Sequence, residues 1–203
     1  MTGPARWRWV LTTALVTVLL AGCAVRAPQP PDAGRIVAVG DWDAPPAPDA
    51  WAFTGRTSLK LADEGATAAV SWLQDAATYR IDLRGALGAG SLRIVGDEAG
   101  VQLTTADGER YGADSPRELV RAITGYDLPV GFLRHWVTAS PVPWLDGRVT
   151  LDEAGRPRQL QQNGWAVTFD GYRRVGDHQL PGRIGVDHRD MAIRLVIGEW
   201  RLR

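Results

Sequence analysis

Through most of residues 51–203, apolar side chains alternate with polar or small ones. A period of two residues places the apolar side chains on one face of a β-strand, whereas a helix needs a period near 3.6. The apolar positions in the first half of this region are Trp51, Phe53, Leu59, Leu61, Ala66, Ala68, Val70, Trp72, Tyr79, Ile81, Leu83, Leu92, Ile94, Val101 and Leu103. Turn sequences such as Asp63-Glu64-Gly65 separate the runs. The pattern predicts an antiparallel meander with one apolar face.

The second half of the region returns to strands after residue 148. Its apolar positions are Val149, Leu151, Leu160, Trp165, Val167, Phe169, Ile184, Val186, Ile193, Leu195 and Ile197. Asn163-Gly164 between two alternating runs predicts a tight hairpin. Trp200 and Leu202 continue the last run in the opposite phase, so we expect a β-bulge at Gly198-Glu199.

Two short amphipathic helices interrupt the strands. Ser115-Pro116-Arg117-Glu118 combines an N-cap serine, a proline at the first helical position and a glutamate at the third. The helix predicted there places Leu119, Val120 and Ile123 on one face and ends at Gly125. A second helix, beginning near Pro129, places Val130, Leu133, Trp136 and Val137 at helical spacing. We therefore expect a mainly β (α+β) fold of roughly ten antiparallel strands and two helices.

The N-terminus has the pattern of an export signal. Arg6 and Arg8 precede an apolar run, residues 9–21, that is too short to span a membrane comfortably. Leu20-Ala21-Gly22-Cys23 resembles the bacterial lipobox, in which the cysteine is acylated and the preceding peptide is removed. Cys23 is the only cysteine in the chain, so no disulfide is expected. The alternative is a buried N-terminal helix that ends in a chance cysteine.

Acylation of Cys23 would fix the chain to a membrane, because each buried methylene contributes about 0.8 kcal/mol and two or three chains anchor stably. Ala24 stands where lipoproteins kept in the inner membrane usually carry aspartate, which predicts a lipid anchor on the periplasmic face of the outer membrane. Residues 24–49 are rich in Pro, Ala and Asp and predict an extended tether. We expect a signal peptide at 1–22, the acylated cysteine and tether at 23–50, and the folded domain at 51–203.

Several segments of this domain resemble the outer-membrane lipoprotein receptor LolB family. They cover essentially all of the domain in the family's order, and are Trp51 with Gly55-Arg56, Trp72 with Gln74, Leu83 to Gly88, Ala113 to Glu118, Gly125 with Leu128-Pro129, Leu133 with Trp136, Gln162 to Val167, Tyr172, Leu180-Pro181, and Val196 to Trp200. The resemblance implies a LolA/LolB-like fold, in which a strongly curved antiparallel sheet forms a half-open β-barrel and short helices cover an apolar cavity.

The resemblance also implies a function. Such a protein accepts lipoproteins from the periplasmic carrier LolA, binds their acyl chains, and incorporates them into the outer membrane without ATP or any other cofactor. We expect it to act as a monomer. The family's functional leucine on a projecting loop corresponds to Leu87, although Ala86-Leu87-Gly88 stands where relatives often have Pro-Leu-Gly. The alternative for Leu87 is an ordinary leucine folded back onto the core.

Apolar residues on the strands and on the second helix are the candidates for the acyl-chain cavity. They are Phe53, Leu59, Trp72, Ile81, Leu83, Leu92, Trp136, Trp165, Phe169, Leu195 and Ile197. Broad aromatic walls with few polar groups would suit many cargoes, since only the lipid is common to them. The alternative for each of these residues is packing in a solid core.

Other classes of function find less support in the residues. The formal net charge is zero and no long basic run is present, so nucleic acid is not an expected partner. His135, His178 and His188 form no metal-type spacing, and we find neither a nucleophile elbow nor a phosphate-binding loop. We expect no catalysis. Two alternatives stay open: a lipoprotein that binds free glycolipid or phospholipid, and a structural anchor for an envelope machine.

Overall fold

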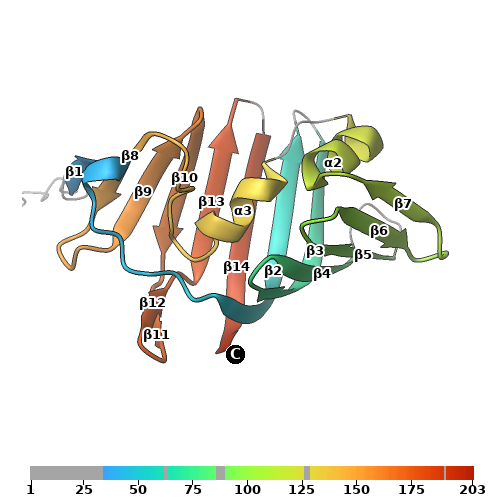
Figure 1. Ribbon diagram of the computed structural model, residues 1–203, viewed down its shortest axis with the longest axis horizontal. Helices are drawn as coiled ribbons and strands as arrows, with labels where there is room; N and C mark the ends of the chain where they lie inside the picture. The colour runs from blue at the N-terminus through green and yellow to red at the C-terminus, as the bar shows by residue number, and fades with distance from the viewer. Residues whose placement is uncertain (1–33, 62–63, 86–89, 126–128, 190) are drawn as a thin grey trace, which may run out of the picture. The chain divides into compact units, whose positions relative to one another are not determined.

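The computed structural model describes residues 34–61, 64–85, 90–125, 129–189 and 191–203 (Figure 1). Twelve strands form one antiparallel sheet in the order β1 (Arg35–Ala38), β8 (Gly147–Leu151), β9 (Pro157–Gln162), β10 (Trp165–Asp170), β13 (Arg183–His188), β14 (Met191–Leu202), β2 (Ala50–Leu61), β3 (Glu64–Asp75), β4 (Thr78–Arg84), β5 (Ser91–Gly96), β6 (Val101–Thr105) and β7 (Arg110–Ala113). β11 (Arg173–Val175) and β12 (His178–Leu180) form a separate hairpin. β1 and β7 are the two edges, so the sheet is curved but not closed into a barrel. The expected fold class is confirmed.

Pairing between the last strand and the first long strand joins the two halves of the sheet. β2 to β7 follow one another as a meander, and β8 to β14 form the second half. β14 pairs antiparallel with β2 along nearly the whole length of both strands. Residues 34–203 thus form one compact unit with its own hydrophobic core.

Both predicted helices are present, and Figure 1 shows them on the same face of the sheet. α2 (Pro116–Thr124) begins at Ser115, whose side-chain oxygen accepts a hydrogen bond from the Glu118 backbone N–H at 3.2 Å. It ends at Gly125, where φ is 76°. α3 (Val130–Trp136) follows. Ile123 was expected on the apolar face of α2 but is 42% exposed, because this short helix buries mainly Leu119.

The predicted bulge in the last strand is confirmed and determines where Trp200 points. Ile197 pairs with Gly55 and Glu199 with Thr54, so Gly198 is the extra residue. The shift in phase brings Trp200 to the inner face, where its Nε1–H donates to the carbonyl oxygen of Pro181 at 2.9 Å. A Cβ atom on Gly55 would lie 2.3 Å from the Val196 carbonyl oxygen, so only glycine fits opposite the bulge.

The bulge completes a cluster of aromatic rings at one end of the sheet. Trp51, Phe53, Trp72 and Trp200 have ring centroids between 5.2 and 6.0 Å apart, in stacked, tilted and edge arrangements. All four side chains are buried. Aromatic pairs at such distances contribute about 0.5–1.5 kcal/mol each beyond the area they bury. This end of the domain is therefore packed by aromatic rings.

Four strands were not expected from the sequence. β1 lies within the segment that its composition assigned to the tether, and it pairs with β8. A short 3₁₀ helix, η1 (Val39–Asp41), follows it. β7 pairs with β6, and β11 and β12 pair with each other. These strands have three or four residues each, which is too few for a two-residue period to be visible.

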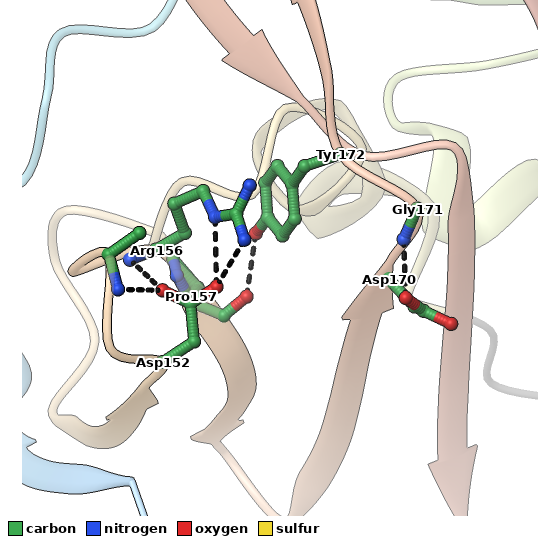
Figure 2. A network of polar contacts seen from close by, with 7 residues as sticks. Asp152, Arg156, Pro157, Asp170, Gly171 and Tyr172 are labelled. Carbon is green, nitrogen blue, oxygen red and sulfur yellow. Dashed lines mark hydrogen bonds and ion pairs between the residues drawn. The ribbon is translucent and has the colours of Figure 1, made fainter.

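A polar network fixes the turn between β8 and β9 to the segment after β10 (Figure 2). Arg156 Nε donates to the Asp152 carboxylate at 2.8 Å, and its guanidinium lies 5.1 Å from the centre of the Tyr172 ring. The Tyr172 hydroxyl donates to the Pro157 carbonyl oxygen at 2.7 Å. Burial raises the pKa of Tyr172, so the hydroxyl keeps its proton.

Gln162 connects the sheet to the segment that follows α3. Its side chain is 2% exposed and lies on β9. Oε1 accepts hydrogen bonds from Trp136 Nε1 at 3.2 Å and from the Val142 backbone N–H at 2.9 Å. Nε2 donates to the carbonyl oxygens of Val142 at 3.1 Å and of Leu145 at 2.8 Å. One buried amide thus makes four hydrogen bonds, which hold the C-terminal end of α3 and the chain after it.

We predict that Gln162→Leu lowers the free energy of unfolding by about 3 kcal/mol or more, because two buried donors, the Trp136 indole N–H and the Val142 backbone N–H, would lose their acceptor at about 1–3 kcal/mol each. Urea denaturation of residues 24–203 measures this. Gln161→Leu is the matched control, since Gln161 is exposed on the opposite face of the same strand. We expect the control to change stability by less than about 0.5 kcal/mol. Equal effects of the two substitutions would contradict this role of Gln162.

Candidate functional site

An apolar cavity of about 210 Å³ lies between the inner face of the sheet and the two helices. Thr57 is the one polar residue in its lining. The lining residues are Phe53, Thr57, Leu59, Val70, Trp72, Ile81, Leu83, Ile94, Val120, Val130, Leu133, Trp136, Val137, Ile184, Val186, Ile193 and Leu195. They come from β2, β3, β4, β5, β13, β14, α2 and the region of α3. The side chains therefore do not fill the space under the helices.

Most of the residues predicted for the cavity do line it. These are Phe53, Leu59, Trp72, Ile81, Leu83, Trp136 and Leu195. Trp165, Phe169 and Ile197 are not among the lining residues and are buried in the core, and Leu92 packs against that core. Trp165 and Phe169 lie on β10, next to β9, where the segment held by Gln162 covers the sheet. Ile197 lies beside the bulge, near the aromatic cluster.

Sequence reasoning missed several lining residues. On the strands these are Thr57, Val70, Ile94, Ile184, Val186 and Ile193, and on or next to the helices Val120, Val130, Leu133 and Val137. The strand residues share the two-residue period of the predicted ones, so the signal was present in the alternation. The alternation identifies the inner face of a strand, but it does not show which part of that face is left uncovered.

A second cavity, of about 440 Å³, adjoins the first and shares Trp72, Ile81 and Val130 with it. Its lining is mixed, and consists of Trp72, Gln74, Ala77, Tyr79, Ile81, Asp97, Glu98, Pro116, Val130, Gly131, Phe132, Arg134 and Trp144. Trp144 is 62% exposed. The two cavities therefore lie next to each other; one is apolar apart from Thr57, and the other carries charge.

Two of the polar side chains in this second cavity differ in how well they are paired. Gln74 is satisfied, since Oε1 accepts from Trp72 Nε1 at 3.1 Å and Nε2 donates to the Ala76 carbonyl oxygen at 2.8 Å. The Tyr79 hydroxyl is buried and has no hydrogen-bond partner within the described part of the chain. Burial raises the pKa of Tyr79 to about 12, with a smaller opposing effect from the charge of Arg134.

His135, at the end of α3, is held in its neutral form. Its Nε2 atom accepts a hydrogen bond from Arg134 Nε at 3.2 Å, and its ring meets the Trp144 ring edge-on at 5.4 Å. Burial, and then the charge of Arg134, lowers the pKa of His135 to about 4. An uncharged imidazole is compatible with the apolar surroundings of α3.

Some predicted positions lie outside the described residues. These are Cys23, with the signal peptide and the first part of the tether, and Leu87. Within the ranges that the structure describes, no group of three or more His, Cys, Asp or Glu side chains is placed to hold a metal ion. In the same ranges, no helix has the length and apolar character needed to cross a membrane.

Comparisons with known proteins agree with this geometry. Residues 49–200 match the family described as Outer membrane lipoprotein LolB. A protein named outer-membrane lipoprotein LolB from Alkalilimnicola ehrlichii is 36% identical over 204 aligned residues, which cover 95% of this chain and 96% of the relative. A protein of the same name from Halorhodospira halophila is 34% identical and covers 98% of each chain. The crystal structure of a LolA superfamily protein from Nitrosomonas europaea has a similar fold, with a TM-score of 0.50 at 10% identity over 76% of this chain and 86% of that one.

We predict that acid destabilises the domain through His135. The folded-state pKa of about 4 lies below the ordinary value of 6.5, so between these pH values the unfolded chain binds a proton that the folded chain does not. The stabilisation is complete above pH 6.5 and is lost as the pH falls toward 4. Between pH 7 and pH 5, we expect the free energy of unfolding to fall by about 1 kcal/mol more in the wild type than in His135→Phe. Urea titrations at both pH values measure this, and parallel losses in the two proteins would contradict it.

Proposed function

Because this chain belongs to the LolB family of outer membrane lipoproteins, we propose that it is a receptor anchored in the outer membrane that accepts lipoproteins from the periplasmic carrier LolA and incorporates them into that membrane. The cargo's acyl chains would occupy the apolar cavity during transfer. The observation that carries the proposal is the unfilled hollow under α2 and α3, whose lining is apolar except for Thr57. In this proposal the protein acts as a monomer and makes or breaks no covalent bond.

The physical reason for such a receptor is the cost of exposing acyl chains to water. At about 0.8 kcal/mol per methylene, exposing two or three chains would cost on the order of tens of kcal/mol. Chains that pass from one apolar cavity to another avoid this cost, so modest differences in affinity are enough to set the direction of transfer. The aromatic and aliphatic walls contact only the part that all acylated cargoes share.

The cavity must widen to take this cargo. Its 210 Å³ is below the roughly 300–1,000 Å³ of typical ligand sites. Gln162 fixes the C-terminal end of α3 to the sheet. In our proposal the movable parts are therefore α2 and the N-terminal end of α3, which supply Val120, Val130 and Leu133 to the lining.

The membrane contacts in this proposal come from two parts of the chain outside the described residues. Acylated Cys23 would anchor the protein in the outer membrane, with the following residues as a tether. Leu87 would help to push cargo into the bilayer. Its loop starts after Gly85 and ends before Gly90, and the Gly85 N–H donates to the Gly90 carbonyl oxygen at 2.8 Å. Both glycines have positive φ values, 82° and 78°, so the described residues close a narrow neck at the base of this loop.

A charge placed in the apolar cavity tests the proposal. We predict that Ile193→Asp lowers capture of an acylated lipoprotein from its carrier by at least about tenfold, because the carboxylate would lose hydration beside the acyl chains. Val196→Asp is the matched control, since Val196 lies on the same strand, faces outward and is 53% exposed. Native mass spectrometry of residues 24–203 mixed with loaded carrier measures capture, and thermal melting checks the fold of both variants. Co-purified free lipid without any capture of acylated protein would favour a glycolipid or phospholipid carrier instead.

We predict that a substitution at Leu87 slows the insertion of cargo into the membrane without weakening the acceptance of cargo from the carrier. Leu87→Glu should accept labelled lipoprotein as the wild type does, because in this proposal Leu87 acts in the insertion step and not in the capture of acyl chains. It should insert that cargo into vesicles of outer-membrane lipid at least about tenfold more slowly, because a carboxylate enters the apolar layer poorly. The assay uses the full chain with Cys23 acylated, and an unacylated chain separates the effect of anchoring. Insertion at the wild-type rate would remove Leu87 from the mechanism.

A further inference from the structure

Opposite charges line the second cavity without meeting one another. Asp97 and Glu98 lie in the turn between β5 and β6, whereas Arg134 lies on α3. Within the described part of the chain, Arg134 forms no ion pair, and its only hydrogen bond is the one that Nε donates to His135. Its two terminal nitrogens are therefore available as donors. All three side chains line the same space of about 440 Å³.

The walls of this cavity suit an amphiphilic ligand. Trp72, Phe132 and Trp144 supply apolar surface, while the two carboxylates and the guanidinium supply acceptors and donors. Polar groups of both kinds in one cavity match a ligand that itself has carbonyl oxygens and N–H groups. The ring of Tyr79 adds a hydroxyl without a partner beside the same space.

The position of the second cavity beside the first indicates which end of a cargo it would meet. Trp72, Ile81 and Val130 line both cavities, so the two are neighbours, and a molecule with its hydrocarbon in the apolar cavity would have its polar end in the second one. An acylated cysteine has ester and amide carbonyls at the point where its chains join, followed at once by peptide N–H groups. These groups cannot enter the apolar cavity without losing hydrogen bonds.

We propose that the second cavity binds the polar junction of the acylated cysteine, with the Arg134 guanidinium donating to its ester and amide carbonyls. Glu98 and the Oδ2 atom of Asp97 accept from the first peptide N–H groups, since Asp97 Oδ1 already accepts from the backbone N–H groups of Ala99 at 2.8 Å and Gly100 at 3.2 Å. This inference rests on the proposed function and adds a site that distinguishes acylated protein from hydrocarbon alone. The junction orients the cargo, with its peptide leaving past the exposed Trp144. The apolar cavity alone offers no such orientation, since its walls are almost uniform.

The test compares two probes on residues 24–203. One probe is a synthetic triacylated cysteine peptide followed by uncharged serines, and the other is diphenylhexatriene, a hydrocarbon with no polar group. We expect Arg134→Met to weaken lipopeptide binding by about tenfold, which corresponds to losing a hydrogen bond from a charged donor. Binding of diphenylhexatriene should stay unchanged. Arg110→Met is the matched control, since Arg110 is exposed on β7 and lines neither cavity.

A second variant protects the test against misfolding of the first. Glu98→Ala alters an exposed turn residue, so it should melt like the wild type and still lose lipopeptide affinity by about threefold or more. Equal loss of both probes in both variants, or loss of neither, would overturn the inference and leave the proposed function intact. Failure of the wild type to bind either probe would instead count against the proposed function. Competition by short-chain phosphatidylethanolamine as strong as that by the lipopeptide would also overturn the inference, because the site would then recognise a lipid headgroup.

Discussion

The hydrogen bonds of one buried amide hold the cover of the cavity in place. α3 has seven residues, too few for a helix to be stable by its own hydrogen bonds. Gln162 pairs with the indole of Trp136 at the end of α3 and with both backbone polar groups of Val142 beyond it. The helix is thus fixed at one end by polar contacts and does not depend on a filled core beneath it. This allows the inner face of β2, β3, β13 and β14 to stay partly uncovered.

The distribution of packing along the sheet follows from this arrangement. On one side of the hollow, the segment held by Gln162 covers β8 to β10 as solid core, and at one end of the sheet Trp51, Phe53, Trp72 and Trp200 pack together. Between these two regions the apolar face meets empty space. Apolar side chains left uncovered there forgo about 25 cal/mol for each Å² that packing against another element would bury. A ligand with apolar surface that fills the hollow recovers this free energy.

How far the sequence predicts this structure depends on whether the signal is local. The phase change between Ile197 and Trp200 is visible in six residues, so the bulge and the inward direction of Trp200 could be predicted. The serine, proline and glutamate at the start of α2 are equally local.

β1 is different, because it pairs with β8 more than a hundred residues later and comes from a segment whose prolines suggest a tether. The burial of Trp165 and Phe169 in the core could not be predicted for the same reason, since alternation marks the inner face of β10 but does not show that a distant segment covers it. Gln162 lies two residues after Leu160, so it points to the inner face of the strand, where an apolar side chain is expected. An amide is needed there because it donates to the carbonyl oxygens of Val142 and Leu145, which the sequence pattern does not reveal.

Holding and releasing the same cargo sets opposite requirements, and the two adjoining cavities meet them in different ways. Apolar walls bind hydrocarbon in proportion to buried area and with little regard to direction, so they retain many cargoes but orient none. Charged and polar groups contribute less net affinity, because each must first lose water, but they require a defined geometry. Arg134 lies on the short helix that covers the apolar cavity, whereas Asp97 and Glu98 lie in the turn between β5 and β6. Any movement of α3 that widens the apolar cavity therefore also changes the distance between these charges. Binding of a polar junction between them would couple the position of the helix to the presence of cargo, so that release from one cavity weakens binding in the other.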